Sequence, residues 1–105
     1  MARYNERKIP YETQVRLMDS FCKTISQFKS KAAVYNFFKD MLNRQERMML
    51  IRRLLIAEML QAGHSYRNIM KQLHCGSTTI ARVQRWLNFG RGGYKTAIKT
   101  KKKKN

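Results

Sequence analysis

The sequence predicts an all-α protein built around a helix-turn-helix, and three observations lead to this prediction. Apolar residues recur at spacings of three and four from Tyr11 to Leu87, which is the period of an amphipathic helix. Capping and turn residues divide that pattern into five segments. The chain has 105 residues, about the length of one domain, and no polar linker occurs before residue 88. We therefore expect a single helical domain over residues 11–88.

Residues 1–10 form a polar N-terminal arm that ends at the only proline, Pro10. Proline is tolerated in the first turn of a helix but not inside one, so a helix is expected from Tyr11 to about Phe28. Its apolar residues form two rows, and the resulting stripe is wider than one neighbouring helix requires. Ser30 is a suitable N-cap for a second helix. The apolar positions of that helix are Val34, Phe37, Phe38, Met41 and Leu42.

Residues 43–46 have the pattern of a capping box, so a third helix should begin at Arg44. Ten of the thirteen positions in residues 48–60 are apolar, which predicts burial almost all round this helix, and Gly63 suits its left-handed end. One small chain cannot readily cover both this surface and the first helix, so the sequence favours a homodimer. The alternative is a monomer in which the first three helices pack among themselves.

Lysine and arginine number 23 against six aspartate and glutamate residues, which gives a net charge of +17. Residues 63–105 contain no acidic side chain. A polyanionic partner is therefore expected, and double-stranded DNA fits best because clustered cations release counterions from its phosphates. An anionic membrane surface and a merely solubilising charge are the alternatives. Residues 89–105, with the run Lys101–Lys104, form a Gly/Lys-rich basic tail that we expect to be disordered.

Residues 65–87 have the pattern of a helix-turn-helix, in which a first short helix braces a second one that enters the DNA major groove. Ser65 caps the first helix, residues 74–76 form the turn, and Ser77 caps the second helix. The inward-facing positions are Ile69, Met70, Leu73, Ile80, Val83 and Leu87. The alternative is an ordinary helical hairpin with a basic, solvated face.

The outward face of the second helix predicts contacts to bases, because arginine can bond a guanine edge in two places and hydroxyls can reach a base or a phosphate. These base-reading candidates are Ser77, Thr78, Thr79, Arg82 and Arg85. The first helix and the basic tail predict contacts to the DNA phosphates. The phosphate candidates are Arg67, Asn68, Lys71, Gln72, Lys101, Lys102, Lys103 and Lys104.

The remaining reactive side chains form no recognisable site. His64, His74, Cys22 and Cys75 lack the spacing of zinc ligands, and no catalytic set of acid, base and nucleophile occurs. We therefore expect no enzymatic activity, no metal and no cofactor. His74 stands where many helix-turn-helix motifs have a glycine with positive φ, and Gly76 is expected to relax the turn instead. Neither a signal peptide nor an apolar run long enough for a membrane span occurs, which predicts a cytoplasmic protein without a membrane partner.

Four segments of the sequence resemble the Trp-repressor superfamily, and its small YerC/YecD branch more closely. They are residues 42–46, Arg52–Arg53, residues 65–69 and the run 76–87, which reads Gly-Ser-Thr-Thr-Ile-Ala-Arg-Val-Gln-Arg-Trp-Leu. The resemblance implies an interleaved all-α homodimer whose N-terminal helices contribute to the interface, with two recognition helices about one DNA turn apart. We accordingly expect a bacterial, nucleoid-associated protein.

The resemblance also implies a small-molecule corepressor, but three positions depart from the Trp repressor itself. Asn43, Val83 and Trp86 stand in place of its threonine, glycine and serine. Arg53 and Arg82 match its ligand-binding arginines. We expect Val83 and Trp86 to fill the space that the indole ring of a ligand would need, so that tryptophan is not the corepressor.

The sequence therefore predicts a homodimeric transcriptional regulator that binds specific DNA sequences and has no enzymatic activity. The first alternative is an architectural or accessory protein that coats DNA or RNA with little sequence preference, which the basic tail favours. The second alternative is a role of that tail at a membrane surface or as a protein adaptor.

Overall fold

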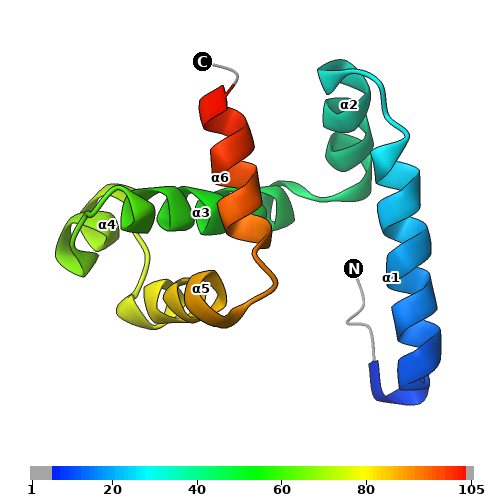
Figure 1. Ribbon diagram of the computed structural model, residues 1–105, viewed down its shortest axis with the longest axis horizontal. Coiled ribbons are helices and arrows are strands. Elements are labelled where there is room, and N and C mark those ends of the chain that lie inside the picture. The colour runs from blue at the N-terminus through cyan, green and yellow to red at the C-terminus, as the bar shows by residue number, and fades with distance from the viewer. Residues whose placement is uncertain (1–5, 104–105) are drawn as a thin grey trace. The chain divides into compact units, whose positions relative to one another are not determined.

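The computed structural model describes residues 6–103, which form six α-helices and one short 3-10 helix, with no strand among them (Figure 1). In chain order the elements are η1 (Glu6–Lys8), α1 (Tyr11–Ser26), α2 (Lys31–Met41), α3 (Arg44–Gln61), α4 (Tyr66–Leu73), α5 (Ser77–Phe89) and α6 (Gly93–Lys103). The all-α prediction is confirmed. The chain divides into two compact units, residues 1–41 and residues 42–105, in place of the single domain expected over residues 11–88.

The first unit contains α1 and α2, and both helices begin where the sequence predicts. Helix α1 starts directly after Pro10 and ends at Ser26, slightly before the predicted end. The Ser30 hydroxyl accepts a hydrogen bond from the Ala33 N–H at 3.1 Å, which confirms Ser30 as the cap of α2. These ends are therefore set by local sequence.

Aromatic contacts hold α1 and α2 together. The ring of Phe37 on α2 lies 5.1 Å from the ring of Phe28 and 6.3 Å from that of Phe21, between centroids. Such tilted pairs stabilise by about 0.5–1.5 kcal/mol beyond the area they bury. No residue of α1 or α2 is buried, however, and Met18 is 62% exposed. The first unit thus leaves both apolar rows of α1 largely open to solvent.

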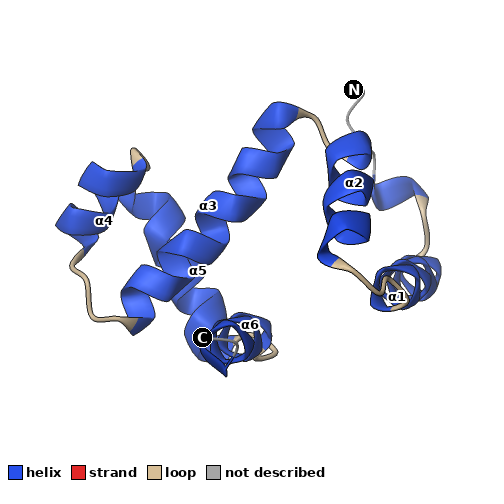
Figure 2. Cartoon of the chain, turned by 90° about the horizontal axis from the view of Figure 1, so that it is seen from above, coloured by secondary structure: helices blue, strands red, loops and turns tan. Residues whose placement is uncertain are grey.

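The second unit packs α4, α5 and α6 against α3, which is its central helix (Figures 1 and 2). Its buried core comprises Ile56, Ala57, Ile69, Ile80, Val83, Leu87 and Ile98. Each of the four helices contributes at least one of these side chains. The two helices of the predicted helix-turn-helix, α4 and α5, are therefore held against α3 by one shared core.

Hydrogen bonds at both ends of α3 explain its length. The Asn43 side chain accepts from the Glu46 N–H, and the Glu46 carboxylate accepts from the Asn43 N–H, both at 2.9 Å, which confirms the capping box. At the other end Gly63 has a φ of +91°, and the His64 N–H donates to the Met59 carbonyl at 3.0 Å. This is the 6→1 bond of a Schellman motif, so the prediction that Gly63 ends the helix is also confirmed.

The single chain by itself does not bury α3 almost all round. Only Ile56 and Ala57 of this helix are buried, whereas residues 48–51 are each about half exposed. The buried residues of α3 lie in its C-terminal half, so the apolar N-terminal half has no cover within its own unit. No helix within residues 6–103 is long and apolar enough to cross a membrane.

The predicted disorder of the basic tail is also wrong, because residues 93–103 form α6. Ile98 is buried in the core of the second unit, and Tyr94 packs against that core. The Lys101 ammonium lies 3.1 Å from both carboxylate oxygens of Glu58 on α3. Tyr94 and Ile98 are four residues apart and therefore lie on the same side of α6. The prediction of disorder relied on the many lysines and overlooked this apolar side. Lys104 lies outside the described residues.

Gly90 makes the turn between α5 and α6 sensitive to a single methyl group. Its N–H donates to the Trp86 carbonyl at 2.8 Å, and a Cβ atom on Gly90 would overlap that carbonyl oxygen. We expect Gly90→Ala to displace this turn and to lower the free energy of unfolding by about 1–3 kcal/mol, measured by urea denaturation. Gly93→Ala is the matched control, because a Cβ there meets nothing within 4 Å. Equal stability of the two variants would contradict the expectation.

Candidate nucleic-acid interface

Helices α4 and α5 form the helix-turn-helix that the sequence predicts. The Ser65 hydroxyl accepts from the Asn68 N–H at 3.2 Å, so Ser65 caps α4 as expected. Ile69 on α4 and Ile80 on α5 are fully buried, and Leu73 packs against the same core. The expected inward position of Met70 is wrong, since its side chain is 38% exposed. The inner face is therefore narrower on α4 than the spacing suggested.

The turn between these helices uses a histidine where the sequence pattern favoured a glycine. His74 has φ 52° and ψ 49°, which is the left-handed conformation, whereas Gly76 is extended with φ −87°. Gly76 is the N-cap position of α5, and Ser77 is its first helical residue. The expectations that Gly76 relaxes the turn and that Ser77 caps α5 are therefore wrong. Cys75 packs against the core, which holds the turn in this shape.

The base-reading candidates lie at the start and along one side of α5. Ser77, Thr78, Arg82 and Arg85 are exposed, whereas Thr79 is half-buried. The first turn of α5 contains no acidic residue, so its unpaired N–H groups and the nearby cations all favour an anion. This arrangement can donate hydrogen bonds to both base edges and phosphate oxygens.

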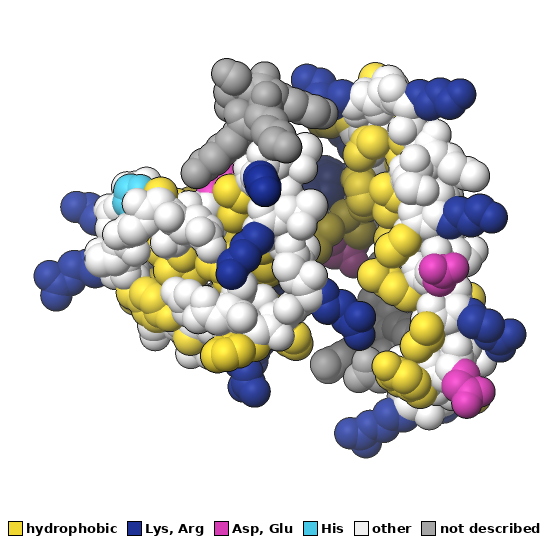
Figure 3. Space-filling model, in the orientation of Figure 1, with side chains coloured by type: hydrophobic (Ala, Val, Ile, Leu, Met, Phe, Trp, Pro, Cys, Tyr) yellow, Lys and Arg dark blue, Asp and Glu magenta, His cyan; other side chains and the backbone are white. Residues whose placement is uncertain are grey.

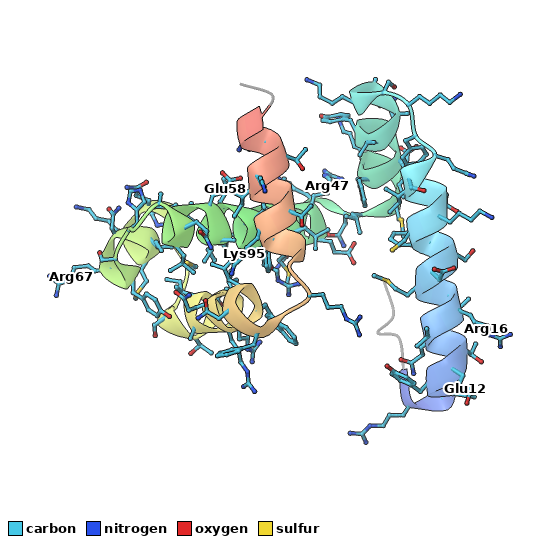
Figure 4. All side chains as sticks on the ribbon, viewed as in Figure 1. Glu12, Arg16, Arg47, Glu58, Arg67 and Lys95 are labelled. Atoms are coloured by element: carbon cyan, nitrogen blue, oxygen red, sulfur yellow. The ribbon has the colours of Figure 1, made fainter. Side chains whose placement is uncertain are left out.

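The phosphate candidates on α4 include a row of hydrogen-bonded side chains. Asn68 Nδ2 lies 2.6 Å from His64 Nδ1, and Gln72 Nε2 donates to Asn68 Oδ1 at 3.1 Å. Arg67 extends away from the helix (Figure 4), and Lys71 is exposed. Sequence reasoning missed His64 as a member of this row, although its spacing of four residues from Asn68 is the signal that indicates it. These hydrogen bonds orient the side-chain amides of Asn68 and Gln72, which were expected to contact DNA phosphates.

Of the tail candidates, Lys101 has a side chain that the structure describes, and that side chain binds α3 and not α4 or α5. Helix α6 runs from the end of α5 past α3, so that its last turn lies on the side of α3 away from α5 (Figure 1). Figure 2 shows α6 nearly end-on. Lys101 is paired with Glu58 there. Lys102 and Lys103 continue α6, although their side chains lie outside the described part of the structure.

A cavity of about 690 Å³ lies between α3 and α5. It is lined by Met49, Arg52, Arg53, Thr79, Arg82, Val83, Trp86 and Tyr94. Val83 is buried as expected, but Trp86 is 61% exposed and forms part of the wall. The expectation that these two residues fill the space is therefore wrong. Three arginines and no acidic residue line the cavity, so its chemistry suits an anionic group.

Three of the residues that line this cavity, Met49, Arg52 and Tyr94, were not predicted as site residues from the sequence. Arg52 was noted only in the family resemblance, and Tyr94 lies in the tail that was expected to be disordered. Thr79 and Arg82 are base-reading candidates that also face the cavity. Within residues 6–103, no three His, Cys, Asp or Glu side chains gather closely enough to hold a metal ion.

Comparisons with known proteins agree with this architecture. The sequence profile of the family described as Trp repressor protein matches residues 16–102. The chain is 33% identical over 81 residues to the uncharacterized protein YerC of Bacillus subtilis (strain 168), a match that covers 77% of this chain and 78% of YerC. The family resemblance seen in the sequence is thereby confirmed.

Two solved structures share the fold. The crystal structure of a TrpR-like protein from Eubacterium eligens ATCC 27750 superposes with a TM-score of 0.75 at 28% identity, covering 81% of this chain and 88% of that one. The crystal structure of a candidate Trp repressor from Staphylococcus aureus gives a TM-score of 0.72 at 25% identity. This match covers 95% of this chain and 96% of that one. The second match extends over nearly the whole length of both chains.

Proposed function

The chain belongs to the Trp repressor family as a YerC-like member, and from this premise we propose that it is a homodimeric, non-enzymatic transcriptional regulator that binds specific DNA sequences. The observation that carries the proposal is the pair α4 and α5, whose inner faces are buried in one core while their outer faces expose basic and hydroxyl side chains. A helical hairpin with only a structural role does not require an exposed basic face. The absence of acidic residues from position 63 onward also supports binding to DNA.

On the proposed complex, α5 enters the major groove and α4 lies across the phosphate backbone. Arg82 and Arg85 would then read guanine edges, while Ser77 and Thr78 reach bases or phosphates from the start of α5. Arg67 and Lys71 would neutralise phosphates, and Asn68 and Gln72 would donate to them. Discrimination between sequences thus comes from α5, and register on the duplex comes from α4.

A second copy of the chain is the proposed cover for the exposed apolar surfaces. The first unit has no buried residue in either helix, and the N-terminal half of α3 exposes residues 48–51. Apolar surface of this kind is costly in water, and a two-fold related copy offers a self-complementary surface for it. The dimer also gives the protein two recognition helices, as a pseudo-palindromic site requires.

Selection from a random-sequence DNA library tests the proposal directly. We expect enrichment of pseudo-palindromic sites whose half-sites lie about one helical turn apart. The enriched duplex should bind more tightly than a scrambled duplex of equal length at every salt concentration, because the phosphate contribution is common to both. Equal binding of the two duplexes would contradict a regulator and favour an architectural protein, a second candidate supported by the net charge of +17.

L-Tryptophan is not expected to be the effector, although the cavity is open. Val83 and Trp86 line the cavity without filling it, but Val83 places a branched side chain where the Trp repressor has a glycine. No acidic side chain in the lining can pair with the ammonium group of tryptophan. Isothermal titration calorimetry of the full chain with L-tryptophan should show no saturable micromolar binding. The variant Val83→Gly is the informative comparison, because it removes the branched side chain beside Arg82. Saturable binding to the unmodified chain would contradict this expectation.

A further inference from the structure

We propose that His64 belongs to the phosphate-contacting face of α4 and that its protonation strengthens DNA binding, by adding a cation and by turning the amides of Asn68 and Gln72. The proposal rests on the DNA-binding function proposed above. It depends on three features of His64: a fixed position, a hydrogen bond whose direction changes on protonation, and surroundings in which the carboxylates are already engaged.

The main chain holds His64 in place at the junction of α3 and α4. Its N–H donates to the Met59 carbonyl at 3.0 Å, which is the bond that ends α3. The next residue, Ser65, caps α4 by accepting from the Asn68 N–H at 3.2 Å. His64 is therefore fixed at the entrance to α4, and the residue is exposed to solvent.

The side chain of His64 lies in line with the phosphate candidates of α4. Asn68 follows it by four residues and Gln72 by eight, and contacts of 2.6 and 3.1 Å join the three side chains in a row. Arg67 and Lys71 are exposed and flank this row at helical spacing. Arg67 extends from α4 in Figure 4, and Figure 3 shows a histidine at the surface of this end of the second unit, close to basic side chains.

In the neutral ring, Nδ1 of His64 accepts a hydrogen bond. The amide nitrogen of Asn68 can only donate, so its partner Nδ1 carries a lone pair and the ring hydrogen is on Nε2. Asn68 Oδ1 accepts in turn from Gln72 Nε2. The hydrogen bonds of the row thus all point toward His64, and one amide hydrogen of Gln72 is used within the row.

Protonation of His64 reverses the direction of this row. The imidazolium carries a hydrogen on each ring nitrogen, so Nδ1 becomes a donor and can no longer accept from Asn68. The Asn68 amide then turns to present Oδ1 to the ring, and its nitrogen donates to Oε1 of Gln72. Both hydrogens of Gln72 Nε2 become available to phosphate, and the ring Nε2–H adds a charged donor, which bonds an anion more strongly than a neutral one does.

The charges around His64 make DNA phosphate the fitting counterion of the protonated ring. On α4, on α5 and in the turn between them, the side chains that are charged or titrate near neutral pH are Arg67, Lys71, His74, Arg82 and Arg85. On α3, Glu58 is paired with Lys101 of α6 at 3.1 Å, and Glu46 closes the capping box at the opposite end. These two are the only acidic residues from position 42 onward. Within the described part of the second unit, both carboxylates are therefore already engaged.

The pH dependence of DNA binding by the full chain tests the proposal. Fluorescence anisotropy measures affinity for the selected duplex between about pH 6 and about pH 8, the range in which histidine changes charge, at constant ionic strength. The test variant is His64→Gln, because glutamine can accept from Asn68 but takes up no proton in this range. The control is His74→Asn, which removes the only other histidine and keeps a residue type that tolerates the left-handed conformation.

We expect the affinity of the unmodified chain to rise about threefold for each half-site from about pH 8 to about pH 6, with a salt slope steeper by about one for each chain. The control should show the same rise. His64→Gln should lose the rise but bind within about twofold of the unmodified chain at about pH 8, since the bond to Asn68 is kept. His64→Ala, which removes that bond, should bind about two- to threefold more weakly than His64→Gln throughout.

Three binding results would overturn the proposal: no rise in the unmodified chain, a rise retained by His64→Gln, or a rise lost in His74→Asn. Equal affinities of His64→Gln and His64→Ala would overturn the positioning of Asn68 by His64. Nuclear magnetic resonance of the free protein adds a readout that needs no DNA. The side-chain amide signals of Asn68 and Gln72 should move with pH in the unmodified chain and stay in place in His64→Gln, and signals that stay in place in both would exclude the reversal of the row.

Failure of this proposal is distinguishable from failure of the proposed function. If selected and scrambled duplexes bind equally but the rise is lost in His64→Gln, the role of His64 stands while the sequence-specific function fails. If the selected duplex is preferred and its affinity does not change with pH, the regulator stands while the role of His64 fails.

Discussion

Replacing Ile51 by glutamate is expected to dissociate the proposed dimer and to abolish tight binding to a two-half-site operator. Ile51 is 48% exposed on the uncovered half of α3, so the substitution is compatible with the folded chain. In a two-fold interface each copy would bury an unpaired carboxylate, at a cost of about 2 kcal/mol or more per copy. Association should therefore weaken on the order of 1,000-fold. Light scattering at micromolar concentration should give a mass near the 12.5 kDa of one chain.

The matched control for this prediction is Gln61→Glu, which places the same charge at an exposed position near the end of α3. This control should keep the dimer mass and the half-site spacing found by selection. Circular dichroism should show equal helix content in both variants, because neither side chain is buried. A monomeric mass for the unmodified protein would contradict the dimer, and an unchanged dimer in Ile51→Glu would exclude this face of α3 as the interface.

Substituting Arg82 by alanine is expected to lower affinity for the selected site by about 1–3 kcal/mol for each half-site, or roughly 5- to 150-fold per half-site. The side chain is exposed on α5 and can bond a guanine edge in two places. The loss should be confined to one base step in each half-site, because phosphate contacts by α4 remain. Competition among single-base operator variants, measured by fluorescence anisotropy, should show relaxed preference at that step alone.

Arg16→Ala provides a charge-matched control for Arg82→Ala. Arg16 is exposed on α1 in the first unit, and its removal should leave the base preference unchanged. Because Arg82 also lines the cavity between α3 and α5, the stability of the variant must be measured by urea denaturation. A loss of affinity that is uniform across all operator variants would show that Arg82 contacts phosphate and does not read a base.

The sequence predicts which residues of α5 belong to the candidate site, but not which residues of other helices lie next to them. Residues such as Thr78 and Arg85 lie exposed on α5, as the helical period indicates. The pairing of Thr79 and Arg82 with α3 around a cavity depends on how two helices distant in sequence cross, which no local pattern specifies. The same holds for Lys101, whose ion pair joins it to a residue 43 positions earlier in the chain.

The sequence by itself determined five of the six helices and the capped ends of α2, α3 and α4. Ser30, Asn43 and Ser65 cap helices through bonds to residues three positions away, and Gly63 ends α3 through the conformation that glycine adopts at low cost. Such bonds close within one helical turn, so residue type and spacing suffice to predict them.

Only the tertiary structure decided which apolar faces are covered. Ile98 is buried in the core, which anchors the lysine-rich C-terminal segment as a helix. His74 adopts a left-handed conformation, and the next residue of that turn, Cys75, packs against the same core. The N-terminal half of α3 stays open because its own unit buries only Ile56 and Ala57 of that helix. Burial depends on contacts between segments far apart in the chain, and the free energy of those contacts outweighs local preference.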